Sequence, residues 1–426
     1  MKLNKWTLGL AALGLVSLTS VARADEAKTT PLLTALSATT ISGYIDTSME
    51  WNPGTGNASP APFKFNAGKQ DGFNLDSVDI RIAKPLEEGQ WSSGYVVDLM
   101  FGPDTSLTTG EGGGVNSGIA DHVRQAYLNL RMPVGNGLDW KIGRFDSPIG
   151  YESVDGYKDP NFTRSYGFTF EPSENTGVLA EYRINESVAI SAGVANTVTT
   201  GPINSRGAAP AESSKAWIGM VNLTAPESWG AIGGSGLYFG SEYGPSFASD
   251  GKQRWHNYVG ATIKTPVQGL TLGASWDDVH KLDVAGVDTG YNMAVAGYAS
   301  FKFTDKASLH IRGEYAHGAG LGALADAFNG TFAVPDPTSP TGLSSVNNPL
   351  HKVIAVTGTF QYDLWQNVIS RLEVRWDHAA DGSRPFGGTA SAATAASVDA
   401  PVLDGDSISG TKKNSVTVAA NLIFKF

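Results

Sequence analysis

The chain has 426 residues, 31 basic and 41 acidic side chains, a formal net charge of −10 and no cysteine. The missing cysteines exclude disulfides, thiolate metal sites and a lipobox, and the acidity argues against a nucleic-acid partner. The 51 glycines and the 10% of aromatic residues fit a chain made of many amphipathic strands.

The N-terminal segment predicts export. Two lysines precede an apolar run at 8–18, and the tripeptide at 22–24 has the small-x-small form of a cleavage site. The run is only about half of the roughly 20 apolar residues that a membrane-spanning helix needs. We therefore interpret residues 1–24 as a signal peptide, and the mostly polar residues 25–40 as a periplasmic lead-in to the first strand.

From residue 41 onward, apolar and polar residues alternate with a period of two, which indicates strands with one apolar and one polar face. The faces of the strands near 122, 216 and 351 are ambiguous. The alternation predicts sixteen strands, at 41–51, 73–84, 91–101, 122–132, 138–145, 175–184, 188–198, 216–224, 232–243, 254–265, 269–277, 290–303, 307–317, 351–363, 368–378 and 414–426.

The connections between these strands alternate between long and short. Those at 102–121 and 146–174 are long loops, whereas those at 85–90 and 133–137 are short turns. Long extracellular loops, short periplasmic turns and an even number of strands are typical of antiparallel barrels that span the bacterial outer membrane. Aromatic residues gather near both ends of the strands, as in the girdles of such barrels. We predict that residues 41–426 form an all-β transmembrane barrel of this kind.

Charged side chains occupy the polar face of many strands, where an aqueous lumen would accept them and lipid would not. If the loop at 146–174 folds inward, its acidic residues would face a basic wall across a narrowed pore. The alternative, a loop that caps the barrel from outside with its charges in water, stays open. The predicted basic wall consists of Arg312, Arg371 and Arg375. The predicted acidic residues of the constriction are Asp146, Glu152, Asp155, Asp159, Glu171 and Glu174.

The sequence around this loop resembles a known family. Residues 141–152 read KIGRFDSPIGYE, and TRSY at 163–166 and TGVL at 176–179 follow. Together with ISGYID at 41–46, these segments are similar to the OmpL-like β-barrel porin family of Gram-negative bacteria, most specifically over residues 138–185. The resemblance implies an outer-membrane porin, and it names no solute.

The end of the chain adds to the resemblance. Leu422, Phe424 and Phe426 close it on alternating apolar residues, and this ending is similar to the signal that the barrel-assembly machinery recognises in its clients. We predict a passive channel for small hydrophilic solutes and ions. Its expected partners are that machinery, membrane lipids and lipopolysaccharide, and similarity to other porins of this size suggests a homotrimer. No cofactor or metal is predicted, because the seven histidines are dispersed without metal-ligand spacing.

Two other functions remain as alternatives. An outer-membrane hydrolase with a site at the barrel rim would use Asp277, Asp278 and His280, but the chain contains neither an HExxH nor a GxSxG motif. We therefore predict no catalytic residue. A scaffold or adhesion barrel would need a plugged lumen, whereas the predicted inward faces are polar and contain many small residues.

Overall fold

The computed structural model describes most of the predicted barrel. The signal peptide predicted at 1–24 lies outside the described residues, as does the lead-in predicted at 25–40 except for its last three residues. The structure describes residues 38–53, 69, 71–87, 89–105, 122–201, 203–207, 212–247, 252–282, 286–320, 332–335, 343–346, 351–384, 386 and 412–426.

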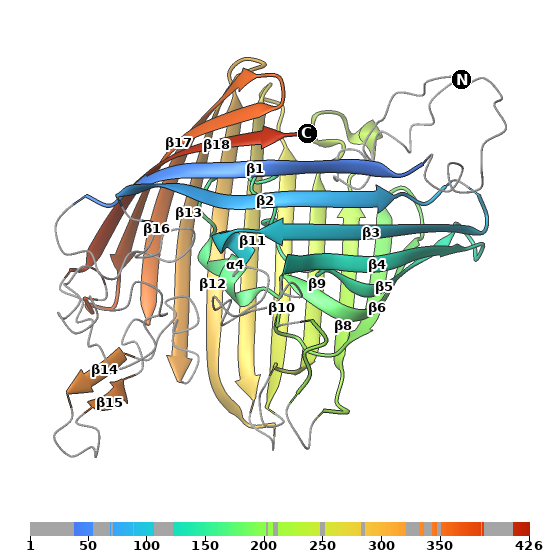
Figure 1. Ribbon diagram of the computed structural model, residues 1–426, viewed down its shortest axis with the longest axis horizontal. Coiled ribbons are helices and arrows are strands. Elements are labelled where there is room, and N and C mark those ends of the chain that lie inside the picture. Colours follow the sequence, from blue (N-terminus) through green and yellow to red (C-terminus); the bar gives the residue numbers. More distant parts are fainter. Residues whose placement is uncertain are drawn as a thin grey trace.

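Sixteen strands, each antiparallel to its neighbours, close into one barrel (Figure 1). The first strand pairs with the last, so that Tyr44 lies opposite Lys425 and no strand edge of the barrel is left unpaired. The barrel strands are β1 Thr40–Trp51, β2 Gly72–Lys84, β3 Ser92–Phe101, β4 Val123–Met132, β5 Leu138–Asp146, β6 Glu174–Arg183, β7 Val188–Ala195, β8 Ala216–Thr224, β9 Gly236–Pro245, β10 Gln253–Lys264, β11 Leu270–Leu282, β12 Asp288–Lys302, β13 Ala307–Gly320, β16 Lys352–Trp365, β17 Val368–Ala379 and β18 Asn414–Lys425.

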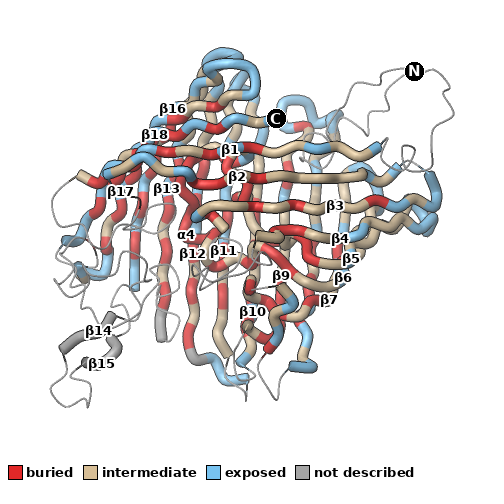
Figure 2. Tube along the Cα trace, viewed as in Figure 1, coloured by how far each residue is buried: buried red, intermediate tan, exposed pale blue. Residues whose placement is uncertain are grey.

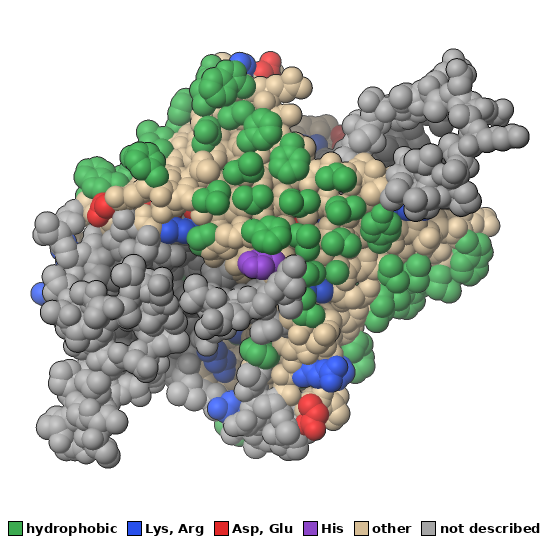
Figure 3. Space-filling view, in the orientation of Figure 1, with side chains coloured by type: hydrophobic (Ala, Val, Ile, Leu, Met, Phe, Trp, Pro, Cys, Tyr) green, Lys and Arg blue, Asp and Glu red, His purple; other side chains and the backbone are tan. Residues whose placement is uncertain are grey.

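The two faces of the strands differ in the way that the alternation predicts. In β18, Leu422 and Phe424 are exposed on the outer surface, whereas Thr417 and Asn421 point inward and are buried. Figure 2 shows the same alternation of buried and less buried residues along other strands. Figure 3 shows hydrophobic side chains spread over the outer surface of the strands nearest the viewer. The outside of the barrel is therefore apolar and the inside is polar, which suits a wall between lipid and a hydrophilic interior.

The sixteen predicted strands correspond to the sixteen barrel strands, and the predicted fold class is confirmed. Two boundaries differ by several residues. The strand predicted from 232 begins at Gly236, because Glu227–Ile232 forms a 3-10 helix, η3, after Pro226. The strand predicted to end at 277 continues to Leu282, because its polar end still pairs with β12.

Bulges interrupt two of the barrel strands, and the one in β4 explains why the face of the strand near 122 was ambiguous in the sequence. The register between β3 and β4 shifts after Asp98, which leaves Arg124 as an extra residue in β4. The register between β1 and β2 shifts after Asp46 and leaves Asp76 as an extra residue in β2. Because of the bulge in β4, the adjacent residues Arg124 and Gln125 are both buried. A bulge interrupts the period of two, so a strand that contains one cannot be divided into faces by counting.

The described residues outside the barrel wall form a few short elements. The helix α4 (Tyr166–Phe170) lies in the connection from β5 to β6. Strands β14 (Phe332–Pro335) and β15 (Leu343–Val346) pair with each other in the connection from β13 to β16. In the part of the chain that the structure describes, no helix is long and apolar enough to cross a membrane.

Replacing Val374 by arginine tests the assignment of the outer face. Val374 lies in the middle of β17 and is 49% exposed. A charge on the lipid face near the bilayer midplane lowers the free energy of unfolding by about 2–4 kcal/mol. We expect a loss of that size for Val374→Arg in guanidinium titrations of the barrel folded into lipid vesicles.

The matched control for this prediction is Val368→Arg, the same substitution on the same face of β17 but at its first residue. Near the interface the cost falls to about 0–1 kcal/mol. Equal losses at the two positions would show that the outer face of β17 does not cross a bilayer in the predicted way.

Candidate functional site

The connection from β5 to β6, residues 147–173, folds into the barrel. Its helix α4 packs against β11, β12 and β13 from the inside (Figure 1). Ser165 caps the helix, because its hydroxyl accepts a hydrogen bond from the backbone N–H of Phe168. The buried rings of Tyr166 and Phe170 pack on small inward-facing residues of the wall, namely Ala294, Ala316, Val353 and Ala355. These small side chains leave the space that the helix fills.

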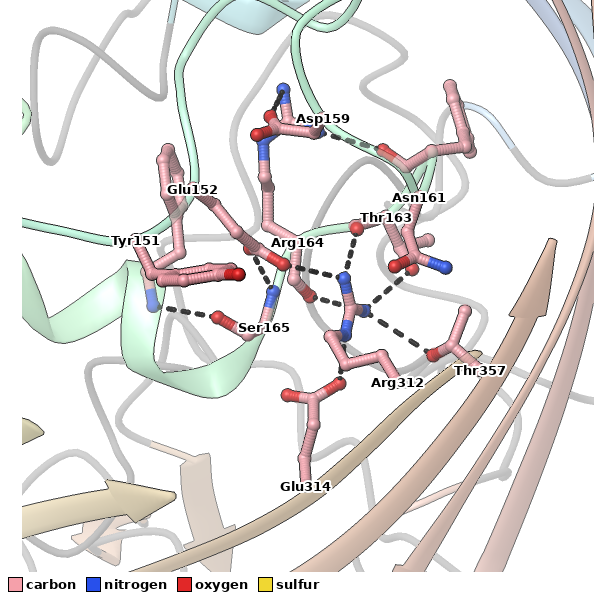
Figure 4. Close-up of polar contacts among 12 residues, drawn as sticks. Tyr151, Glu152, Asp159, Asn161, Thr163, Arg164, Ser165, Arg312, Glu314 and Thr357 are labelled. Atoms are coloured by element: carbon pink, nitrogen blue, oxygen red, sulfur yellow. Dashed lines mark hydrogen bonds and ion pairs between the residues drawn. The ribbon is translucent and has the colours of Figure 1, made fainter. Parts of the chain in front are cut away.

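Arg312 of β13 joins the loop to the wall (Figure 4). Its side chain is fully buried, and Nη1 donates to the Glu152 carboxylate at 2.8 Å and to the Thr163 carbonyl at 2.6 Å. Nη2 donates to the carbonyl of Arg164 at 3.1 Å, and Nε donates to Glu314 of the same strand at 2.6 Å. The guanidinium therefore uses all three of its nitrogens, two of them on the loop.

Arg375 of β17 lies beside the same turn of the loop. Its Nη1 donates to the carbonyl of Arg164 at 2.6 Å, and its Nη2 donates to Asp377 at 2.9 Å. The ring of Tyr166 lies 5.1 Å from the guanidinium carbon, and its hydroxyl donates to Asp377 at 2.8 Å. A cation, a carboxylate and an aromatic ring thus hold the start of α4 together.

Carboxylates of the wall accept the backbone N–H groups of the loop. Glu373 of β17 accepts from the amide of Phe162 at 2.6 Å and from the amide of Thr163 at 2.9 Å. Glu314 accepts from the amide of Tyr166 at 2.7 Å. Hydrogen bonds to an ionised acceptor are stronger than neutral ones. We call the contacts of Arg312, Glu314, Glu373 and Arg375 with the loop the loop latch.

The third predicted arginine, Arg371, also contacts the loop. It donates to the backbone carbonyls of Gly156 at 2.8 Å and Asp159 at 2.5 Å. All three arginines of the predicted basic wall are therefore in direct hydrogen-bonding contact with the loop, with no gap between wall and loop at these points. Whether they set the ion selectivity of a pore stays a prediction.

A second charged cluster lies at the base of the loop, around Arg124. This buried guanidinium contacts the carboxylates of Asp98 at 3.4 Å, Asp146 at 2.7 Å and Glu174 at 3.7 Å, and it also contacts Asp155. Burial alone would raise the pKa of Asp155, but the charge of Arg124 holds it below its usual range. The cluster brings together three of the six predicted acidic residues.

The other three acidic residues of the prediction lie further along the loop. Glu152 pairs with Arg312, and Asp159 pairs with Arg164 at 3.1 Å. Glu171 accepts a hydrogen bond from the backbone N–H of Tyr151 at 3.2 Å. The six acidic residues thus lie along the loop and at its two ends, and five of them contact one of three arginines, Arg124, Arg164 or Arg312.

Two of these loop carboxyls have raised pKa values. Burial raises the pKa of Asp159 to about 6, against the opposing effect of Arg164. Burial, together with the nearby carboxyl of Asp277, raises the pKa of Glu171 well above its usual range. The charge of the loop therefore changes between neutral and mildly acidic pH.

Sequence reasoning missed several residues that hold the loop. Arg124 was missed because it is the bulged residue, and Arg164 because it lies in a loop, where no period assigns a direction. Glu373 is one of the charged residues on the inward face of β17, but nothing local in the sequence links it to residues 162 and 163. The only available signal was the excess of charged residues on the inward face of β17.

The residues of the hydrolase alternative do not form one site. Asp277 points into the barrel and contacts His256 Nε2 at 3.0 Å. Asp278 and His280 lie on the opposite face of β11, where His280 contacts Asp278 at 3.1 Å and Asp288 at 2.6 Å. Among the described residues, no three His, Asp or Glu side chains are grouped as a metal site.

Comparison with solved structures shows the same fold. OmpT of Vibrio cholerae, folded in vitro and in its trimer form, has a TM-score of 0.53 at 10% identity, over 91% of this chain and 99% of that one. The channel DcaP of Acinetobacter baumannii has a TM-score of 0.52 at 12% identity, over 91% and 97%. An anion-selective porin from Comamonas acidovorans has a TM-score of 0.51 at 11% identity, over 91% and 99%. At these identities the likeness establishes the fold alone.

A comparison with family models identifies the family. A search of the curated proteins finds no match. The model described as "Putative beta-barrel porin-2, OmpL-like" matches residues 38–403, which include every barrel strand from β1 to β17. The chain therefore belongs to this OmpL-like porin family, and it is a barrel protein of the bacterial outer membrane.

Proposed function

We propose that the barrel is a passive diffusion channel for small hydrophilic solutes and that residues 147–173 form its constriction. The observation that supports this is the loop latch, which holds a long loop at a fixed place inside the wall. A barrel of sixteen strands encloses an interior too wide for its own side chains to fill. A loop fixed inside it would narrow the lumen, and no bond would be made or broken.

The wall formed by β2 to β6 supports a wet lumen. Its inward-facing ion pairs are partly exposed: Arg81 with Asp98, Arg131 with Asp139 and Lys141 with Glu181. The side chains of the latter two pairs are between 16% and 36% exposed. Charged groups at such exposure need water, and an aqueous path along this wall would supply it.

In this proposal the predicted charged residues divide into two roles. Arg312, Arg371 and Arg375 fix the position of the loop, and the six acidic residues set its charge. Asp146 contributes most to the field in the lumen, because its side chain is 37% exposed, whereas the wall arginines are buried against the loop.

The proposal includes the assembly and the partners expected of such a channel. We propose a homotrimer, on the likeness to an outer-membrane protein whose trimer form has been solved. Lipids and lipopolysaccharide would contact the apolar outer surface. The barrel-assembly machinery would recognise the end of β18, where Leu422, Phe424 and Phe426 are exposed.

Planar-bilayer recording of the refolded protein under a KCl gradient tests the channel directly. We expect discrete open steps, with a reversal potential whose sign reports the charge of the constriction. A folded, heat-modifiable barrel that gives no steps would contradict the proposal and favour the scaffold alternative, in which the loop plugs the lumen.

Loosening the loop latch should change the channel. Glu373→Gln replaces one of the two acceptor oxygens of the side chain by an NH2 group. This group is a donor and would face a backbone N–H donor of the loop. The loss of a charged hydrogen bond weakens the latch by about 1.5–3 kcal/mol, which raises the released population of the loop about tenfold or more. We expect noisier steps of larger conductance.

The matched control is Glu181→Gln, which removes an inward-facing carboxylate that pairs with Lys141 on the opposite wall. Its step size and noise should stay close to those of the parent. If the two variants behave alike, the latch does not control the constriction.

The raised pKa of Asp159 predicts a change of selectivity with pH. The carboxyl is charged above its pKa of about 6 and becomes neutral as the pH falls through that value. The reversal potential should therefore shift away from cation preference between pH 7 and pH 5, with its midpoint near pH 6. Asp159→Asn should show the low-pH selectivity already at pH 7, and a pH response unchanged by this substitution would contradict the assignment.

A further inference from the structure

A polar cavity lies inside the barrel at the end where the turns between strands are short. It has a volume of about 230 Å³ and lies where β11, β12, β13 and β16 meet the turn at residues 303–306. Its lining is contributed mainly by Thr271, Ser300, Lys302, Lys306, His310 and Gln361. We call it the exit pocket. None of these residues belongs to the loop latch.

The strand register explains why the exit pocket is polar. Ser300 of β12 lies opposite Thr271 of β11 on one side and opposite His310 of β13 on the other. One step nearer the turn, Ser308 lies opposite Lys302 and opposite Gln361. Directly opposite residues share one face of a sheet, at about 5 Å between Cβ atoms. Two adjacent rows of hydrogen-bonding side chains thus line the pocket without a large apolar one.

His310 contacts two serine hydroxyls, and one of them remains free to donate a hydrogen bond to a solute. The Nδ1 atom of His310 lies 2.8 Å from the Ser300 hydroxyl, and Nε2 lies 2.9 Å from the Ser308 hydroxyl. A neutral imidazole has one N–H donor and one acceptor nitrogen. It therefore donates to one serine and accepts from the other. In either tautomer, the serine that accepts keeps its own O–H to offer to a solute.

The two lysines of the pocket are only weakly held by other groups and can contact an anion. Lys302 contacts Asp305 at 3.3 Å, but both side chains are more than half exposed, so this pair holds the lysine only weakly. Asp363, the other lining carboxylate, accepts from the amide of Gln361 at 3.1 Å. Behind the pocket, Arg371 donates to the carbonyl of that same amide at 3.1 Å. The lining thus holds two lysines and two carboxylates, and among the described residues Lys306 makes no ion pair.

We propose that the exit pocket binds the oxyanion group, a carboxylate or a phosphate, of a small solute that passes through the barrel. The ammonium groups of Lys302 and Lys306 attract the group, and the spare serine hydroxyl and the Thr271 hydroxyl donate to it. The proposal deepens the channel function, since it assigns a solute class to one end of the path. Binding itself does not depend on whether the channel conducts.

Calorimetric titration of the refolded, full barrel in detergent micelles tests the binding. Succinate and inorganic phosphate are titrated separately, so that the two sources of the oxyanion are distinguished. We expect at least one of them to bind, and Lys302→Gln and Lys306→Gln each to weaken that binding about tenfold, the loss expected for one charged hydrogen bond. The absence of heat with both anions would overturn the proposal.

The control variant is Lys141→Gln, which removes one positive charge from the opposite wall of the same barrel. It should bind the anions as tightly as the parent protein does. If its affinity falls as much as that of Lys302→Gln, the anions are attracted by the charge of the whole lumen and not by the exit pocket. The double variant Ser300→Ala/Ser308→Ala, which keeps the charge and removes both serine hydroxyls next to His310, should weaken binding as well. Conductance of the same samples in KCl decides separately whether the barrel is a channel, so the two proposals fail independently.

Discussion

The polar backbone of residues 147–173 must be satisfied inside the barrel, and most of the inner wall is arranged around that requirement. Apart from the single turn of α4, few hydrogen bonds join one backbone group of the loop to another. Its carbonyls and amides would be costly to bury without partners. Side chains of the loop supply some partners, since Arg164 donates to the carbonyl of Ser153 and Glu152 accepts from the amide of Ser165. The wall supplies others, because Arg312 and Arg375 donate to carbonyls, and Glu373 and Glu314 accept from amides. These charged side chains therefore have a structural role, because they hydrogen-bond to the backbone of the loop.

The position of the loop inside the barrel depends on small residues of the wall as much as on charged ones. The alanines beneath α4 leave room for its aromatic rings. At Gly273 of β11, a Cβ atom would collide with the hydroxyl of Tyr151, so a side chain there would force the Tyr151 ring out of its place. Shape and charge thus select the same position. A loop fixed by both is suited to set a constant width for a passage.

The sequence predicted the wall far better than the loop, for a physical reason. A strand has a period of two, and its lipid-facing side chains are apolar whereas its lumen-facing side chains are polar. The direction of each residue of β18 could therefore be assigned from the sequence. The bulge at Arg124 breaks that period, and its face could not be assigned. The latch joins residues far apart in the chain, such as Glu152 and Arg312. No local pattern encodes which carboxylate meets which arginine, so the inward direction of the arginines was predictable and their partners were not.

The direct contact between loop and wall changes where a selective field can arise. Charges that face each other across water would both act on a passing ion. Here Arg312 and Glu152 are buried against each other, and such a pair largely cancels at a distance. The field in the lumen must then come from groups left partly exposed, such as Asp146 and Lys158 at the base of the loop. In the proposed channel, the latch residues would act on a passing ion mainly through the position of the loop.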